Sequence, residues 1–360
     1  MAEYTDAYKY LADKHKFGDS ESYLRVLKFL MTPRQAEIAA QLPGSPEEVA
    51  RRMGMDPAEV KKDMEILLRR GVVIPTDYKN PESFIFCKHA ERMWEISESL
   101  MGLDDLYTEE DTERLFRLWD DWKKTDYADM TAERWHNLKA MGIAALRIVP
   151  AYRAIQDSPG ILPHEDAREM VRMQSLITVV SCSCRKHMGM MGNPCGRTEA
   201  DPNCLQFARS AEFTLSRGHG REISVDEAIA ILDRNEEDGL VHTWINHAKV
   251  ADAQPYALCS CCRCCCTVWH YADLRNVPND EIFAKSRYEA RVDTELCDGC
   301  QDCVDRCQFD AIEMQKVEGS KRLKAVVDPG KCYGCGVCTL TCEPGALKMH
   351  LVRPPEHIPE

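Results

Sequence analysis

Cysteine is the residue type that dominates the chemistry available to this chain of 360 residues. There are 19 cysteines, and all of them except Cys87 lie after residue 180. A cysteine thiolate is a nucleophile and a ligand for soft metal ions, so we expect the second half of the chain to bind metal. Cys87 stands alone in an apolar stretch and is interpreted as a buried thiol that packs like a small hydrophobic side chain.

The cysteines nearest the end of the chain have a repeated spacing. The pattern C-x2-C-x2-C-x3-C occurs at Cys297, Cys300, Cys303 and Cys307, and again at Cys332, Cys335, Cys338 and Cys342. Three thiolates with two-residue gaps can surround one cubane from a single loop, and the fourth points towards a second cluster. The two motifs closely resemble a bacterial dicluster [4Fe-4S] ferredoxin domain over roughly residues 290–350. Zinc binding is the alternative for this spacing.

The resemblance to dicluster ferredoxins implies that the two motifs exchange their fourth ligands. One cluster is then assigned to Cys297, Cys300, Cys303 and Cys342, and the other to Cys332, Cys335, Cys338 and Cys307. The family commonly has proline directly after the fourth cysteine, where this chain has Gln308 and Glu343. A backbone N–H and a polar side chain at these positions are expected to influence the reduction potentials.

Two further groups of cysteines precede this domain. The first is Cys182, Cys184, Cys195 and Cys204, and the second is Cys259, Cys261, Cys262, Cys264, Cys265 and Cys266. Without Cys87 and the eight ferredoxin-type cysteines, ten of the 19 thiols remain, enough for two four-thiolate clusters. We assign the first group to one probable cluster and four thiols of the second group to another. Mixed ligation between the groups is the alternative.

The consecutive cysteines of the second group suggest two separate sites. Successive side chains of an extended backbone point in opposite directions, so Cys264 and Cys265 are expected to face different sites. We interpret the central clusters as electron relays. The alternative is a cluster that binds substrate. Its candidate residues are Arg185, His219 and His242 for catalysis, with His242, His247 and His270 as possible ligands or proton donors.

The net charge and the apolar patterning limit the partners. The chain has 46 Lys and Arg residues against 59 Asp and Glu residues, and a formal charge of -13 does not favour nucleic acid. No stretch approaches the roughly 20 apolar residues of a membrane-spanning helix, so no membrane insertion is expected. The polar beginning of the chain is unlike a secretory signal. We expect a cytoplasmic protein whose partner is a redox protein or a flavin- or metal-containing oxidoreductase.

After an N-terminal arm of residues 1–18, residues 19–90 resemble a winged-helix domain. Two helices are expected to start after Ser45 and Asp56 and to end near Gly54 and Gly71, before two short strands that surround a polar turn. DNA binding would use the basic residues Lys61, Lys62, Arg69 and Arg70, but Asp63 and Glu65 interrupt this run. A protein-docking or structural role is therefore favoured.

The rest of the chain completes an α+β multidomain architecture. Residues 91–150 are predicted to form a helical segment, with a core-facing stripe of Leu115, Leu118, Trp119 and Trp122. Residues 151–275 alternate strands with capped helices and predict a small cysteine-rich α/β domain. Residues 276–350 are expected to contain a charged linker and the ferredoxin-like domain, and residues 351–360 a tail.

The order of the motifs resembles a poorly characterised family of multi-cluster iron-sulphur proteins from anaerobic microbes. Five segments ahead of the ferredoxin-like domain carry this resemblance: Cys182-Ser-Cys184-Arg185, Cys204-Leu-Gln-Phe207, Gly218-His219-Gly220-Arg221-Glu222, Gly239-Leu-Val-His242-Thr243 and Cys259 to Cys266. The resemblance implies electron transfer for a partner oxidoreductase in anaerobic metabolism, through two [4Fe-4S] clusters and one or two more. The alternatives are a reductase whose central cluster binds the substrate and a redox-sensing winged-helix regulator.

Overall fold

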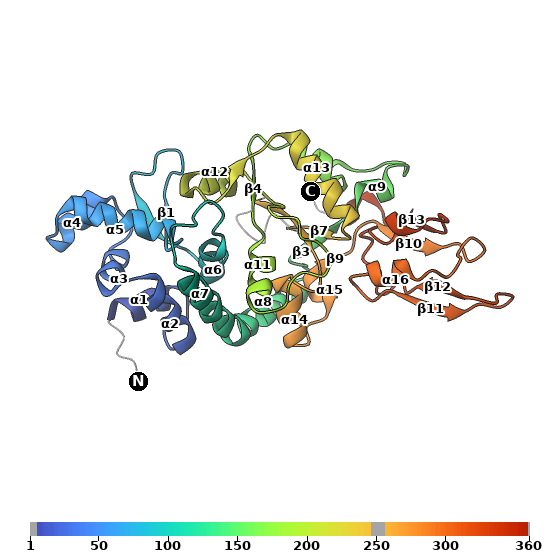
Figure 1. Cartoon of the computed structure of the whole chain (residues 1–360), viewed down its shortest axis with the longest axis horizontal. Helices are drawn as coiled ribbons and strands as arrows, with labels where there is room; N and C mark the ends of the chain where they lie inside the picture. The colour runs from blue at the N-terminus through green and yellow to red at the C-terminus, as the bar shows by residue number, and fades with distance from the viewer. Residues whose placement is uncertain (1–5, 246–255, 359–360) are drawn as a thin grey trace. The chain divides into compact units, whose positions relative to one another are not determined.

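The computed structural model describes residues 6–245 and 256–358, which form two compact units (Figure 1). Unit 1 comprises Met1–Ala132, Val180–Pro194 and Arg209–Glu222. Unit 2 comprises Glu133–Val179, Cys195–Ala208 and Ile223–Glu360. The chain therefore passes between the units several times, and neither unit is one continuous stretch of sequence.

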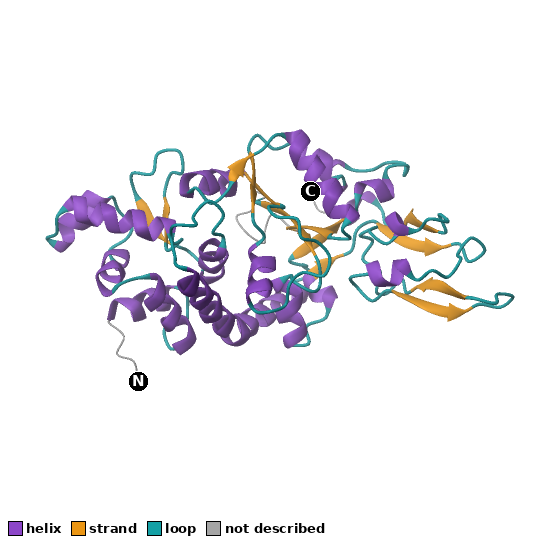
Figure 2. Cartoon of the chain, viewed as in Figure 1, coloured by secondary structure: helices purple, strands orange, loops and turns teal. Residues whose placement is uncertain are grey.

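Unit 1 consists mainly of helices (Figure 2). Its helices are α1 (Asp6–Lys14), α2 (Glu21–Leu30), α3 (Pro33–Ala40), α4 (Pro46–Met53), α5 (Pro57–Arg69), α6 (Ala90–Glu98), α7 (Glu109–Trp122), α11 (Ser183–Met190) and α12 (Ala208–Arg217). A π-helical turn, Lys123–Tyr127, joins α7 to α8 (Ala128–Ala140). The expected tryptophan stripe is confirmed as core, because Trp119 and Trp122 are completely buried.

The capping residues of α4 and α5 act as the sequence predicts. Ser45 accepts a hydrogen bond from the Glu48 N–H, and the Glu48 carboxylate accepts one from the Ser45 N–H, which completes a capping box. Asp56 caps α5 by accepting a hydrogen bond from the Ala58 N–H. The strands β1 (Val73–Pro75) and β2 (Phe84–Phe86) then pair antiparallel. The expected helices and hairpin of residues 19–90 are therefore present.

A buried polar network fixes α11, the helix that begins directly after Cys182. Glu98 is completely buried, with its carboxylate 3.6 Å from the Lys123 ammonium and 2.9 Å from Nδ1 of His187 on α11. The other imidazole nitrogen of His187 lies 3.3 Å from the Asp120 carboxylate. Burial lowers the pKa of Lys123 to about 8, although Glu98 acts in the opposite direction. The unfolded chain binds the lysine proton more tightly, so the burial of charged Lys123 costs stability below about pH 8, and this cost diminishes as the pH rises from about 8 towards the ordinary pKa of lysine.

The centre of unit 2 is a sheet whose strands follow the order β4-β5-β8-β7-β3-β9. These strands are β3 (Leu146–Val149), β4 (Ile177–Val180), β5 (Cys204–Phe207), β7 (Val241–Ile245), β8 (Ala257–Cys261) and β9 (Phe283–Ala284). The two-residue strand β6 is Arg221–Glu222. Its helices are α9 (Tyr152–Ile155), α10 (Ala167–Arg172), α13 (Val225–Glu237), α14 (Thr267–Leu274) and α15 (Asn279–Ile282), with a 3-10 turn at Pro163–Glu165. The apolar residues of β3 pair with β7, so the expected helical segment of residues 91–150 ends in a strand.

The cysteine repeat lies within two antiparallel strand pairs. Strand β10 (Tyr288–Val292) pairs with β13 (Leu347–Leu351), and β11 (Ile312–Lys316) pairs with β12 (Leu323–Val327). The short helix α16 (Asp302–Arg306) and a 3-10 turn, Thr339–Thr341, follow the cysteine loops. A further 3-10 turn is Pro355–His357. The β11–β12 pair forms a hairpin between the two motifs.

The segment expected to be a charged linker is instead an ordered part of unit 2. Residues 276–292 contain α15, β9 and β10. Ser286, Arg287 and Tyr288 are buried. The Arg287 guanidinium forms a completely buried ion pair, 3.1 Å long, with Glu165. The segment differs from the predicted linker because it forms α15, β9 and β10 and because Arg287 has a buried partner, Glu165, that a sequence pattern does not show.

No described helix has the length and apolar character that a membrane span requires.

Replacing Glu98 by glutamine should destabilise unit 1 by about 3 kcal/mol, because the change removes the buried carboxylate that pairs with Lys123 and His187. Thermal unfolding of the full chain under anaerobic conditions measures the effect. The matched control is Glu113→Gln, which removes an exposed ion pair with Arg117 and should change the stability by less than about 1 kcal/mol. Equal stabilities of the two variants would show that the network does not fix α11.

Candidate iron-sulphur and metal centres

Four cysteines from both motifs surround a cavity between the two strand pairs. This first cavity contains about 350 Å³ of empty space, some of it open to solvent. The cysteines that line it are Cys297, Cys300, Cys303 and Cys342. The remaining lining is largely apolar and includes Val292, Met314 and Leu347. The fourth cysteine of the second motif therefore lies with the first three cysteines of the first motif.

The second cavity has the reciprocal composition. It contains about 330 Å³ of empty space and is lined by Cys307, Cys332, Cys335 and Cys338. Its apolar lining includes Phe309, Ile312 and Val327. The structure thus brings the cysteines together in the two exchanged sets that the resemblance to dicluster ferredoxins implies.

The fourth cysteine of each motif accepts a backbone hydrogen bond. The Ala311 N–H donates to Sγ of Cys307, and the Leu347 N–H donates to Sγ of Cys342. The nitrogen–sulphur distance is 3.3 Å in both bonds. Such bonds stabilise the negative charge of a thiolate. The loops also depend on glycine, because a Cβ atom on Gly334, whose φ is +72°, would lie 2.2 Å from the Tyr288 carbonyl oxygen.

Burial raises the pKa of several thiols in the two cavities. It raises the pKa of Cys303 to about 11 and that of Cys335 to about 12, and the pKa of Cys338 is also well above its ordinary value. A metal that binds these sulphurs must displace their protons. Soft thiolates around a cavity with apolar walls are the donor set and surroundings that an iron-sulphur cluster requires, so these residues fit such clusters.

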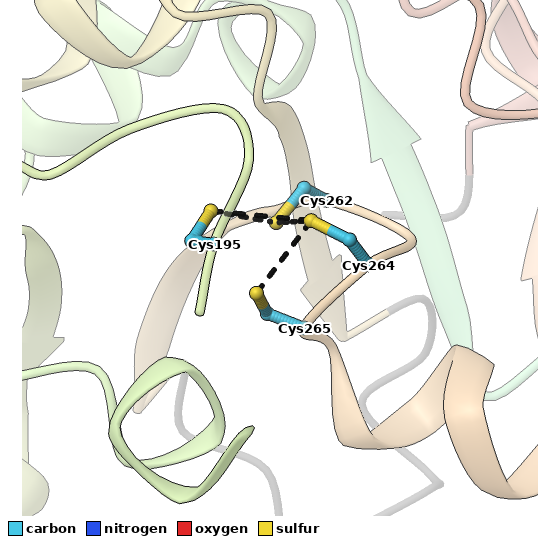
Figure 3. Close-up of side chains that lie close together, drawn as sticks. All are labelled: Cys195, Cys262, Cys264 and Cys265. Atoms are coloured by element: carbon cyan, nitrogen blue, oxygen red, sulfur yellow. Dashed lines mark hydrogen bonds between the residues drawn. The ribbon is translucent and has the colours of Figure 1, made fainter. Parts of the chain in front are cut away.

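A third group of four cysteines lies in the central part of unit 2 (Figure 3). Sγ of Cys195 is 3.6 Å from that of Cys262 and 4.0 Å from that of Cys264. Sγ of Cys264 is 3.3 Å from that of Cys262 and 3.5 Å from that of Cys265. All four sulphurs lie within 4.8 Å of one another. Burial and the neighbouring sulphur of Cys262 raise the pKa of Cys264 to about 11.

This group corrects the first assignment of the central cysteines. Cys195 lies with Cys262, Cys264 and Cys265, which is the mixed grouping, and not in a set with Cys182, Cys184 and Cys204. The expectation that Cys264 and Cys265 face different sites is also wrong. Residues 263–265 form a turn, in which the Cys265 N–H donates to the Cys262 carbonyl, and a turn can direct successive side chains to the same side.

The strands of unit 2 bring three other cysteines to one face of the sheet. Leu205 of β5 pairs with Leu258 of β8, and the same register places Cys204 opposite Cys259. Cys261 lies two residues further along β8 and therefore on the same face. Its sulphur is 3.8 Å from the Thr243 hydroxyl. These three thiols are the described candidates for a further cluster in unit 2.

The remaining cysteines lie elsewhere. Cys266 is buried at the start of α14. Cys182 and Cys184 belong to unit 1, at the beginning of α11. Cys87 is buried, as expected for a thiol that packs as a hydrophobic group.

The other candidate residues are mostly buried and bonded to protein groups. Nδ1 of His242 lies 3.0 Å from the Ser260 hydroxyl, and its Nε2 lies 3.5 Å from the Glu236 carboxylate. His219 is buried in unit 1, where desolvation holds its pKa well below the ordinary value. Arg185 and His270 are half-buried in α11 and α14. His247 lies outside the described residues.

Gln308 has a role that the sequence did not reveal. Its side chain is buried, accepts a hydrogen bond from the Arg263 N–H and donates one to the Gly239 carbonyl. Gln308 directly follows Cys307, and Arg263 lies between Cys262 and Cys264. The residue that replaces the usual proline therefore connects the second cavity with the turn that carries the central cysteines. Its departure from the ferredoxin pattern was the only available signal.

Comparison with protein families supports the assignment of the cysteine repeat. Residues 296–346 match the family model described as "4Fe-4S dicluster domain". The matched stretch contains all eight cysteines of the two cavities. Comparisons with curated proteins and with solved structures gave no match. The last part of the chain is thus similar to dicluster ferredoxin domains and has the cysteines to bind 4Fe-4S cofactors.

Proposed function

We propose that this protein is a multi-cluster iron-sulphur electron-transfer protein that serves a partner oxidoreductase. The observation that carries the proposal is the pair of apolar, four-cysteine cavities within the stretch that matches the dicluster family. Bound [4Fe-4S] clusters supply one-electron transfer. The chain itself supplies thiolates, donates the Ala311 and Leu347 N–H groups to two of them, and excludes water with apolar walls.

The proposed ligands follow the exchanged sets. Those of the first cluster are Cys297, Cys300, Cys303 and Cys342, and those of the second are Cys332, Cys335, Cys338 and Cys307. A further cluster in unit 2 is supported by Cys204, Cys259 and Cys261, which share one face of the sheet.

The first cavity, which contains the exposed Cys300, is the proposed place of electron exchange with a partner. Cys300 is exposed, whereas Cys332, Cys335 and Cys338 are all buried. Two exposed apolar residues lie close to the first cavity. Leu296 directly precedes Cys297, and the backbone carbonyl of Leu323 lies beside Gly299, next to Cys300. The second cavity lies against the rest of unit 2, where the Ala151 N–H donates to the Cys335 carbonyl.

A pair of matched substitutions tests the ligand sets. Cys307→Ser should alter the cluster of Cys332, Cys335 and Cys338, and Cys342→Ser should alter the cluster of Cys297, Cys300 and Cys303, because each fourth sulphur lies in the other motif's cavity. Redox titration followed by electron paramagnetic resonance distinguishes the two clusters. If each substitution changed the cluster of its own motif, the exchanged ligation would be refuted.

Electron exchange itself is tested with the full chain. The anaerobically prepared protein, reduced by dithionite and freed of excess reductant, should give about one electron per [4Fe-4S] cluster to a chemical oxidant such as ferricenium, and then stop. Leu323→Glu should slow exchange with an acidic redox protein, because it places a charge beside the first cavity, and should leave exchange with the small oxidant unchanged. Sustained reduction of a small substrate by the isolated chain with excess dithionite would instead favour the reductase alternative.

The contacts of residues 19–90 support a protein-docking or structural role for this winged-helix-like segment. Tyr78, in the loop between β1 and β2, packs against Phe213 of α12 with ring centroids 5.5 Å apart. The next residue, Lys79, forms an ion pair with Glu212 of the same helix. On the other side, Arg34 pairs with Glu59 and Asp63 of α5. The loop between β1 and β2 thus packs against α12 within unit 1. Helix α5 carries acidic residues as well as basic ones.

The full chain should therefore bind a random DNA duplex and any defined duplex equally weakly at physiological salt. Fluorescence anisotropy with a pool of random-sequence duplexes, followed by selection for tighter binders, measures this. Enrichment of one sequence bound at least about a thousand times more tightly than random DNA would establish the regulator alternative. Lys62→Glu, on the exposed side of α5, would then have to abolish that binding.

A further inference from the structure

We propose that Cys195, Cys262, Cys264 and Cys265 bind a single metal ion, zinc or iron, in a tetrahedral site with four thiolates. The proposal goes beyond the electron-transfer function and does not depend on it, since it rests only on these four residues and the elements that carry them. It also replaces the expectation of a [4Fe-4S] cluster at these positions.

The separations of the sulphur atoms are those of a mononuclear site. Four sulphurs at about 2.3 Å from one tetrahedral ion are about 3.8 Å apart. Four of the six sulphur–sulphur separations among Cys195, Cys262, Cys264 and Cys265 are 3.6, 4.0, 3.3 and 3.5 Å. The thiols therefore converge on one point, and a small movement of each side chain would admit an ion at their centre.

The ferredoxin-like part of the same chain provides an internal comparison. A cubane binds each of its four thiolates through a different iron, so the sulphurs must spread around the cluster. The eight ferredoxin-type cysteines line two cavities of about 350 and 330 Å³. Among residues 6–245 and 256–358, only the central group has three or more potential ligands whose donor atoms all lie within 4.8 Å. The two kinds of site differ in the way that one ion differs from a four-iron cluster.

The surroundings of the four cysteines indicate what the ion would do. Cys195 lies between α11 and β5, in a segment with neither helix nor strand. The other three ligands lie in the turn after β8, 67 or more residues along the chain. One ion would cross-link these segments and so restrict the unfolded chain. The turn also carries Arg263, whose N–H is 3.0 Å from Gln308, so the ion would fix the surface that holds the second ferredoxin-type cavity.

A tetrahedral set of four thiolates is the usual ligand set of zinc and of mononuclear iron. The site would saturate its ion with protein ligands and leave no position for substrate. Counting then limits the remaining chemistry. Of the 19 cysteines, Cys87, the eight ferredoxin-type cysteines and these four leave six, enough for one further four-thiolate cluster.

The test is the stoichiometry of metal and sulphide in the full chain, purified anaerobically. Cubanes contain iron and inorganic sulphide in equal numbers, so a mononuclear site should make total iron plus zinc exceed acid-labile sulphide by about one per chain. X-ray absorption at the zinc edge should show four sulphurs at about 2.3 Å if the ion is zinc. A signal of isolated high-spin ferric iron in the oxidised protein identifies iron. Metal and sulphide in equal numbers, without either spectroscopic signature, would overturn the proposal.

Two variants locate the ion. Cys195→Ser and Cys264→Ser should each remove one metal ion per chain and leave the sulphide content and the signals of the ferredoxin-type clusters unchanged. Cys87→Ala, which removes the lone buried thiol of unit 1, is the matched control and should lose no metal. Loss of about four irons and four sulphides from either variant would assign a cubane to these residues and refute the mononuclear site. If a variant does not fold, the stoichiometry and absorption spectrum of the unaltered chain still decide the question.

Discussion

The side-chain amide of Gln308 holds together the two cysteine-bearing parts of unit 2. It accepts a hydrogen bond from the Arg263 N–H in the central turn and donates one to the Gly239 carbonyl at the end of the α13 region. Gln308 itself is 3 % exposed, and an unpaired amide at this depth would be costly. The geometry of the second cavity therefore depends on the packing of the whole unit and not on the cysteine loops alone.

Apolar packing supports the same junction. Phe309, directly after Gln308, stacks on Tyr333 with ring centroids 4.4 Å apart, and both rings belong to a buried cluster with Trp269 of α14. Cys335 and Cys266 lie in this cluster too. The ferredoxin-like part is thus continuous with the core of unit 2. In the proposed electron-transfer protein, this continuity would hold the two clusters at a fixed distance from the rest of unit 2, which suits electron transfer better than a flexible tether.

The sequence predicted those features that depend on residues close together in the chain. The spacing of the eight ferredoxin-type cysteines predicted two four-thiolate sites, and the caps at Ser45 and Asp56 predicted the starts of α4 and α5. These signals are local, since the helix start or cysteine loop is encoded within a few residues. The structure-dependent part of the ferredoxin assignment, the exchange of fourth ligands, came from the family resemblance.

Features that depend on distant residues were left open or were not predicted, and mixed ligation of the central cysteines was one of two alternatives. The grouping of Cys195 with Cys262, Cys264 and Cys265 requires the turn at residues 263–265 and the pairing of β5 with β8, neither of which the cysteine spacing specifies. The linker prediction failed for a similar reason. From the sequence, Arg287 is expected to be a solvated charge, because its partner Glu165 lies 122 residues earlier in the chain. Tertiary contacts of this kind determine which thiols share a metal.

The most direct test of the proposed iron-sulphur clusters is a crystal structure of the anaerobically prepared chain, with anomalous scattering measured at the iron and zinc edges. We predict four-iron density in each of the two cavities, with Cys342 and Cys307 as the respective fourth ligands. We predict a single compact peak among Cys195, Cys262, Cys264 and Cys265. Single ions in the two cavities would contradict an iron-sulphur electron-transfer protein.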